Sequence, residues 1–215
     1  MIDTSAILSG PVEVGAQVYV GPYCVLGFPA SVVLPSENGT RDANFRPSSR
    51  GVTIGAQAQL MSHVVISEGT VIDDDVWCDH HTYIGCDTRI AQGAQILYGA
   101  KVYHRVSIGR GAWIGGFTCN DAIIEDATVV LGQLVHKFRD ATVGVPEKSP
   151  IIRKSAFVGM NAFIIGGIEV GCGAYIAGGA VLTRSAKPGR LYTGAPAKEV
   201  GRAPSGFSFP KNNIP

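Results

Sequence analysis

The chain has 215 residues, of which 46% are hydrophobic and 16% are charged, and its net charge is +1. This length and apolar content suit one globular domain, while the near-zero charge argues against nucleic acid or an anionic membrane as a partner. The 28 glycines favour a fold rich in tight turns over a helical one. Because we find neither a secretory signal pattern nor an apolar run of membrane-spanning length, we expect a cytoplasmic protein.

From the first residues onward, an aliphatic side chain recurs every six positions, often followed directly by glycine, as in "IGCDTR" and "VGCGAY". Neither the 3.6-residue period of a helix nor the alternation of a hairpin strand explains this spacing. It predicts a solenoid of short parallel strands with the aliphatic side chains inside and turns at fixed positions. The repeated positions are Ile2, Leu8, Val14, Val20 and Leu26, then Ile54, Leu60, Ile66, Ile72, Ile84, Ile90, Ile96, Val102, Ile108 and Ile114, and finally Val158, Ile164, Val170, Ile176 and Leu182.

The repeat is interrupted where loops must leave the solenoid. One excursion covers about residues 27–53, which are rich in Pro, Ser, Asn and Gly, and another covers about 136–152. Between them, after Ile114, the next aliphatic residues are four positions out of phase.

The repeat also defines the domain organisation. We expect a single domain over residues 1–200 that contains both excursions. Residues 201–215 carry no repeat and are expected to form a C-terminal tail.

Five cysteines are scattered along the chain without a CxxC pair. This arrangement argues against a disulfide framework and against a thiolate zinc site, so we expect no bound metal. Each cysteine is predicted to be a small buried or turn residue. They are Cys24, Cys78, Cys86, Cys119 and Cys172.

The [LIV]-G-x-x-[STAV]-x units resemble those of the hexapeptide-repeat family, whose members fold as left-handed parallel β-helices. The resemblance implies an all-β fold with three hexapeptides per triangular coil, and a homotrimer with ligand sites between its subunits. A coil of 18 residues would bring His63 and His81 together on one face.

The segment from Ala156 to Arg202 resembles the last coils of the family's CoA-dependent acetyltransferases. "TGAPAKEV" is similar to their terminal Gly-x-Pro-Ala-Lys, and "VLTRSAKPG" is similar to the turn before it. The resemblance implies acetyl-CoA as co-substrate and puts the family's aromatic position at Phe157. It puts the CoA contacts at Met160, Gly178, Thr183, Arg184 and Lys198.

His136 lies a little upstream of this segment, where acetyltransferases with this ending carry a catalytic histidine. An imidazole can take the proton of an acceptor amine or hydroxyl as that group attacks the thioester. His80 is the rival, since "CDHHTYIGCDTRI" resembles a segment of nucleotide-sugar acetyltransferases in which the histidine is the base. His136 is the predicted base because it is much nearer in sequence to the C-terminal motif.

Asn120 and Asp126 lie where the repeat slips, just before His136. An amide can bond a sugar hydroxyl, and a carboxylate can orient an ammonium group or an imidazole. Both residues can equally be ordinary turn residues that cap the backbone. We therefore hold two interpretations of this pair, acceptor binding and capping.

The sequence thus predicts an acyltransferase that moves an acetyl or other short acyl group from acyl-CoA to an amino group or hydroxyl of a small polar acceptor. The resemblance implies an amino sugar or a nucleotide-linked sugar as that acceptor. One alternative is a non-catalytic assembly protein, because solenoids of this kind also serve as scaffolds. Another is a zinc enzyme like the γ-carbonic anhydrases, although the sequence lacks that family's His-x4-His pair.

Overall fold

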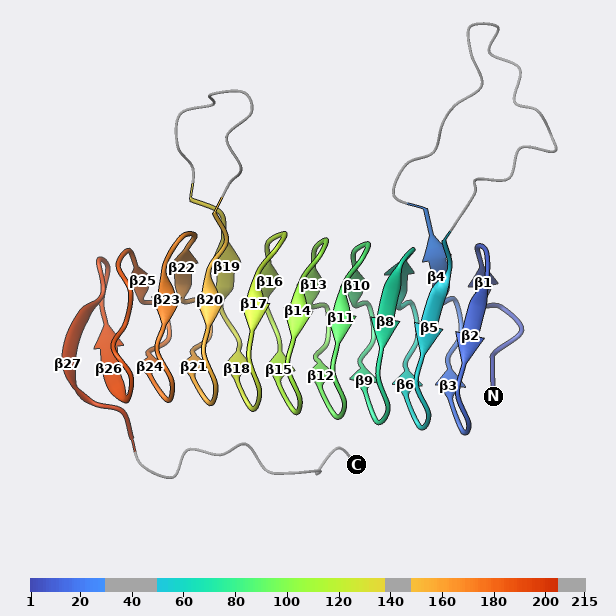
Figure 1. Cartoon of the computed structure of the whole chain (residues 1–215), viewed down its shortest axis with the longest axis horizontal. Coiled ribbons are helices and arrows are strands. Elements are labelled where there is room, and N and C mark those ends of the chain that lie inside the picture. The colour runs from blue at the N-terminus through green and yellow to red at the C-terminus, as the bar shows by residue number, and fades with distance from the viewer. Residues whose placement is uncertain (30–49, 138–147, 205–215) are drawn as a thin grey trace, which may run out of the picture.

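The computed structural model describes residues 1–29, 50–137 and 148–204. Over these ranges the chain forms strands and turns without a helix, and the strands stack into a solenoid of three parallel sheets (Figure 1). The chain visits the sheets in rotation, so each coil contributes one strand to each sheet. We call them sheets 1, 2 and 3, and we name the edges where the chain passes between them edge 1–2, edge 2–3 and edge 3–1.

Sheet 1 consists of β1 (Ile7–Leu8), β4 (Val25–Phe28), β7 (Val65–Ser67), β10 (Tyr83–Ile84), β13 (Lys101–Val102), β16 (Phe117–Thr118), β19 (Gln133–Val135), β22 (Phe163–Ile165) and β25 (Val181–Leu182). Sheet 2 consists of β2 (Val12–Val14), β5 (Val52–Ile54), β8 (Thr70–Ile72), β11 (Arg89–Ile90), β14 (Ser107–Ile108), β17 (Ile123–Ile124), β20 (Ile151–Ile152) and β23 (Glu169–Val170). Sheet 3 consists of β3 (Tyr19–Val20), β6 (Gln59–Leu60), β9 (Trp77–Cys78), β12 (Gln95–Ile96), β15 (Trp113–Ile114), β18 (Val129–Val130), β21 (Phe157–Val158), β24 (Tyr175–Ile176), β26 (Arg190–Thr193) and β27 (Lys198–Arg202). Only β27 runs antiparallel to its neighbour among these pairs.

The strand register confirms the predicted period and the all-β solenoid. Ile66 pairs with Ile84, and Ile84 pairs with Val102, each step being 18 residues. All three side chains are fully buried, so each coil adds one aliphatic residue per sheet to a continuous core. The rings of His63 and His81 stack with centroids 4.8 Å apart, which confirms the 18-residue coil.

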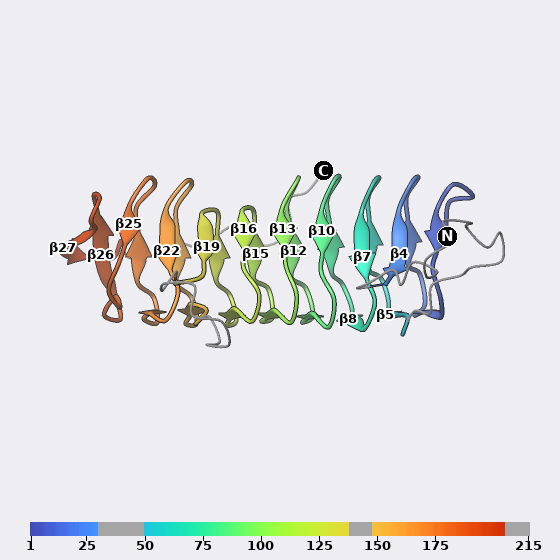
Figure 2. The same cartoon turned by 90° about the horizontal axis from the view of Figure 1, so that it is seen from above.

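A shortened turn at edge 3–1 explains the slip after Ile114. Only Gly115 and Gly116 join β15 to β16, whereas four residues join β12 to β13, and Leu131 and Gly132 repeat the shortcut one coil later. A Cβ on Gly116 would lie 1.8 Å from the Gly132 carbonyl oxygen, so the tight turn requires glycine there. These two coils are therefore narrower at this edge (Figure 2), and the step between them takes only 16 residues, as the pairing of Ile114 with Val130 shows.

Both predicted excursions begin and end at edge 1–2, after β4 and after β19. Strands occupy the ends of the predicted loops: Phe28 belongs to β4, Val52 to β5 and Ile151 to β20. Residues 30–49 and 138–147 lie outside the described residues, as do residues 205–215 of the predicted tail. Gly201 and Arg202, the first residues of that tail, pair with β26.

The described segments contain no helix of the length and apolar character needed to cross a membrane.

Candidate active site

The predicted base, His136, follows β19 where the second excursion leaves edge 1–2. Its Nε2 lies 3.2 Å from the carbonyl oxygen of Asn120. A carbonyl oxygen can only accept, so in the neutral ring Nε2 carries the proton and Nδ1 carries the lone pair. The hydrogen bond thus sets both the orientation and the tautomer of the imidazole.

The Asn120 carbonyl oxygen also binds the segment in which the chain returns from the second excursion. The Ser149 hydroxyl also donates to the Asn120 carbonyl oxygen. In addition, the Lys137 N–H donates to the Lys148 carbonyl oxygen at 3.4 Å, and the Gly167 N–H donates to that of Ser149 at 3.2 Å. The two ends of the second excursion, at Lys137 and at Lys148–Ser149, are therefore hydrogen-bonded to each other and to neighbouring coils, and these bonds fix the position of His136.

His136 continues a column of polar side chains along edge 1–2. The Cys86 N–H donates to Nδ1 of His104 at 2.9 Å, and the His104 N–H donates to Oδ1 of Asn120 at 3.0 Å. These two side chains accept from the backbone of the preceding coil and so cap its turn. His136, one coil further on, donates instead. Sequence analysis missed His104, although its 16-residue spacing from Asn120 and that of Asn120 from His136 was a detectable signal.

Two ion pairs also lie along edge 1–2. Arg50 binds Asp87 through two hydrogen bonds of 2.6 and 2.9 Å, and Arg105 binds Asp121 through two of 2.7 and 2.8 Å. The hydrogen bond from Arg105 is the main cause that lowers the pKa of Asp121, and the charge of His136 contributes in the same direction. A carboxylate therefore persists close to His136 at neutral pH.

The rival histidine, His80, lies at edge 3–1. Its Nδ1 accepts from the Ser62 N–H at 3.2 Å and is 2.6 Å from the Ser62 hydroxyl oxygen. Its Nε2 is 4.0 Å from Oδ1 of Asp79. The Nδ1 lone pair is thus engaged in capping a turn, which is the role that His104 also has.

The two residues proposed to bind the acceptor are separated. Asn120 lies at edge 1–2 and Asp126 at edge 2–3. Each caps a backbone N–H of the preceding coil: Asn120 that of His104, and Asp126 that of Arg110 at 2.8 Å. Of the two, it is Asn120 that contacts His136.

The residues proposed to contact CoA fall into two groups. Met160, Gly178 and the start of β27 with Lys198 lie at edge 3–1, where the Gly179 N–H donates to the Met160 carbonyl oxygen at 2.9 Å. Thr183 and Arg184 follow β25 at edge 1–2 and are exposed. The structure thus brings Arg184 to the edge of His136 and leaves the other group across sheet 1.

Arg184 lies two coils from His136, a separation of about 10 Å at the usual spacing of parallel strands. Gly166 lies in the coil between them, and a Cβ there would lie 1.9 Å from the Lys148 carbonyl oxygen and 2.5 Å from the Lys137 nitrogen, so the backbone of both lysines packs directly against this glycine. A base and a cation therefore share one edge, with Lys137 and Lys148 packed against the coil between them.

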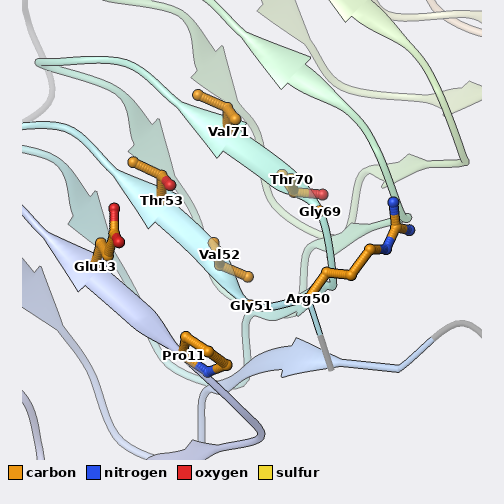
Figure 3. A pocket seen from close by; sticks show the side chains of 9 residues that line it. All are labelled: Pro11, Glu13, Arg50, Gly51, Val52, Thr53, Gly69, Thr70 and Val71. Atoms are coloured by element: carbon orange, nitrogen blue, oxygen red, sulfur yellow. The ribbon is translucent and has the colours of Figure 1, made fainter. Parts of the chain in front are cut away.

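A small cavity lies at the base of the first excursion. It has a volume of about 120 Å³ and is lined by β2, β5 and β8 together with Arg50 (Figure 3). The Arg50 side chain extends away from Glu13 (Figure 3) and binds Asp87, and its Nε lies 3.8 Å from Oε2 of Glu68. The backbone N–H of Arg50 donates to the same Glu68 oxygen at 2.9 Å. The charge of Arg50 is thus compensated within the chain.

Within the described ranges, no group of three or more His, Cys, Asp or Glu side chains is arranged to hold a metal ion.

Comparisons with known proteins agree with the repeat and the fold. No protein-family model matches the sequence. A putative serine acetyltransferase of Schizosaccharomyces pombe is 34% identical over 121 residues, which are 52% of this chain and 42% of the relative. The bifunctional protein GlmU of Stenotrophomonas maltophilia is 26% identical over 204 residues, which are 89% of this chain and 36% of the relative. The chain therefore spans less than half the length of these curated relatives.

Among solved structures, LpxA from Acinetobacter baumannii superposes with a TM-score of 0.61 at 17% identity, over 94% of this chain and 74% of that one. This similarity shows the fold, a left-handed parallel β-helix. The sequence matches show that the chain is similar to hexapeptide-repeat acyltransferases over part of their length, and the structural match shows that it shares their fold.

Proposed function

We propose that the protein transfers an acetyl group from acetyl-CoA to an amino group or hydroxyl of a small polar acceptor, with the chemistry at edge 1–2. The observation that carries the proposal is the hydrogen bond from Nε2 of His136 to the Asn120 carbonyl oxygen. It sets the tautomer and the orientation of the ring, because Nε2 must carry the proton and Nδ1 is then the basic atom. His80 and His104 are oriented differently, since each uses Nδ1 to accept from a backbone N–H.

The reaction follows from this tautomer. As the acceptor nitrogen or oxygen attacks the thioester carbonyl, Nδ1 of His136 takes its proton. The tetrahedral intermediate then collapses, the carbon–sulfur bond breaks, and the imidazolium returns the proton to the CoA thiolate. The carboxylate of Asp121 stabilises the transient imidazolium because it is ionised and close by.

Arg184 is proposed to bind the phosphates of acetyl-CoA, with Thr183 beside it. A guanidinium suits phosphate because it donates in a planar fork. Arg184 lies at the same edge as His136, about 10 Å away at the usual spacing of parallel strands, so the pantetheine arm is proposed to run along this edge, past Lys137 and Lys148.

Met160, Gly178 and Lys198 contact the same CoA in this proposal, although they lie on the far side of sheet 1. One chain cannot present both edges to one ligand without wrapping it around that sheet. A homotrimer resolves this, because edge 3–1 of one subunit can face edge 1–2 of the next. The separation of the two groups is the support for a site built from two subunits.

An amino sugar or a nucleotide-linked sugar is the proposed acceptor, and Asn120 is the proposed acceptor-binding residue because its backbone carbonyl contacts His136. Its Oδ1 caps the His104 N–H, so the side-chain NH₂ would be the group that binds the acceptor. Asp126 also caps a turn, at Arg110, and lies at another edge, which favours the structural role for it. L-Serine is a second candidate, because relatives that match half of the chain are named serine acetyltransferases.

An acetylation assay tests the proposal. The purified chain is incubated with acetyl-CoA and either glucosamine, a nucleotide-linked amino sugar or L-serine, and release of the CoA thiol is followed. We expect acceptor-dependent release with one of them. No binding of acetyl-CoA at millimolar concentration would contradict the proposal and favour the non-catalytic scaffold.

A further inference from the structure

A second cavity, larger than the one beside Arg50, lies on the outer face of sheet 1 in the N-terminal coils. Its volume is about 470 Å³, within the range of small-molecule sites. The strand register aligns Ile7, Val25, Val65 and Tyr83 as four successive outward residues along its length. They span about 14 Å at the spacing of parallel strands, so the cavity is an elongated apolar groove.

The outward-facing residues that line this groove include large apolar side chains that are exposed to solvent. Ile7 is 58% exposed, and Phe28, which also lines the cavity, is 46% exposed. Among the described residues that line it there is no Lys, Arg, Asp or Glu. Its surface therefore favours an uncharged apolar group over a phosphate or a carboxylate.

The polar groups of the cavity gather at its edge 1–2 side. They include Ser67, Cys86 and His104. Burial raises the pKa of the Cys86 thiol, so that side chain stays neutral. Nδ1 of His104 accepts from the Cys86 N–H, so its Nε2 carries a proton and is a hydrogen-bond donor. The cavity thus combines an apolar groove with a donor at the edge that bears His136.

An aromatic track continues from the cavity toward His136. The ring of Tyr83 lies 5.8 Å from that of Tyr103, and the ring of Tyr103 lies 5.0 Å from that of Phe117, measured between centroids. Phe117 in turn pairs with Gln133 in β19, the strand that His136 follows. A ligand in the groove can therefore extend over these rings to the proposed base.

We infer that this cavity binds an uncharged hydrocarbon portion of the acceptor, so that the acceptor is an amphipathic molecule: an alkyl or acyl chain in the groove, and a polar head whose amine or hydroxyl reaches His136. The assignment of the ligand as acceptor rests on the proposed function. Binding of an apolar chain by the groove does not.

Binding of n-octyl β-D-glucoside, compared with methyl β-D-glucoside, tests the groove by calorimetry and ligand-observed NMR on the whole protein. We expect the octyl compound to bind at least tenfold more tightly. Ile7→Asn and Val65→Asp should each remove that advantage. Val71→Asp is the matched control, because Val71 is half-buried like Val65 and lies in the same coil, but on sheet 2. Ile7→Asn covers the possibility that Val65→Asp fails to fold, since Ile7 is exposed.

Acetylation of hexadecyl and methyl β-D-glucosaminide then tests the ligand's role. A long chain is needed because Tyr83 and Val65 lie three and four strand steps from β19, about 14 and 19 Å at the spacing of parallel strands. We expect kcat/KM to be at least tenfold higher for the hexadecyl compound, with the difference lost in Val65→Asp and in Tyr83→Asp and unchanged in Val71→Asp. Equal binding of the two glucosides would overturn the inference. So would the finding that residues 30–49 or a second copy of the chain cover the groove in solution. Tight octyl binding with equal kcat/KM for the two glucosaminides would overturn the role as acceptor site. Tight octyl binding with no acetylation of either would instead contradict the proposed function.

Discussion

Nε2 of His136 lies 3.2 Å from the backbone carbonyl oxygen of Asn120, and this contact separates His136 from the histidines that cap turns. His80 and His104 use Nδ1 to accept a backbone N–H from the preceding coil. His136 instead donates from Nε2 to a backbone carbonyl oxygen, so its basic nitrogen, Nδ1, is not the one that contacts Asn120. The same residue type thus has a structural role at one coil and a proposed catalytic role at another.

Arg184→Ala should raise the Kd of acetyl-CoA about tenfold, because one charge-assisted hydrogen bond to phosphate is lost. The affinity is measured by calorimetry, and kcat at saturating acetyl-CoA should change little. Lys154→Ala is the control, since Lys154 is an exposed cation at edge 2–3 and should leave the affinity unchanged. Equal effects of both substitutions would show that Arg184 acts only through overall charge.

Mixing two inactive variants tests the two-subunit site. His136→Ala disables edge 1–2, and Met160→Glu introduces a carboxylate into the proposed CoA groove at edge 3–1. When the two variants are unfolded, mixed and refolded, hybrid oligomers should recover part of the wild-type turnover, because some sites combine two intact edges. Turnover that stays at the level of the separate variants would show that each site lies within one subunit.

Gly116→Ala should destabilise the fold by about 2 kcal/mol or more, because the new Cβ overlaps the Gly132 carbonyl oxygen. Urea unfolding followed by circular dichroism measures the loss. Gly201→Ala is the control, since a Cβ at that position meets no atom within 4 Å. A loss no larger than that of the control would mean that the narrowed turn can relax.

Asp121→Asn should lower the stability at neutral pH by at most about 1 kcal/mol, since the pair with Arg105 is half exposed. The folded-state pKa of Asp121 is lowered, so its contribution is complete above the unfolded value of about 4 and is lost as the pH falls through the folded value. Wild type and variant should therefore converge in urea unfolding as the pH falls well below about 4. A difference that persists there would assign the effect to packing.

The repeat makes most of the fold predictable. A six-residue period with one aliphatic residue per unit specifies three short strands per coil, and the 18-residue coil that follows from it predicts the stacking of His63 on His81. The period carries this information because each inward position must be filled in every coil.

The grouping of site residues is not predictable in the same way. Gly115–Gly116 and Leu131–Gly132 each shorten a turn by two residues, and the excursion after His136 adds a further length of chain. Counting in steps of 18 therefore fails between Ile114 and Ile152. Only the observed register puts Arg184 at the edge of His136 and Met160 at another. The tautomer of His136 depends on a backbone carbonyl, which no side-chain pattern reveals.

The central claim is that His136 is the base of an acetyl transfer, and single-turnover kinetics of His136→Ala test it most directly. With acetyl-CoA bound and the acceptor in excess, the rate of acetyl transfer should fall at least a hundredfold, while the Kd of acetyl-CoA stays within about twofold of wild type. His80→Ala should retain the wild-type rate. An unchanged rate in His136→Ala, or a comparable loss in His80→Ala, would contradict the account.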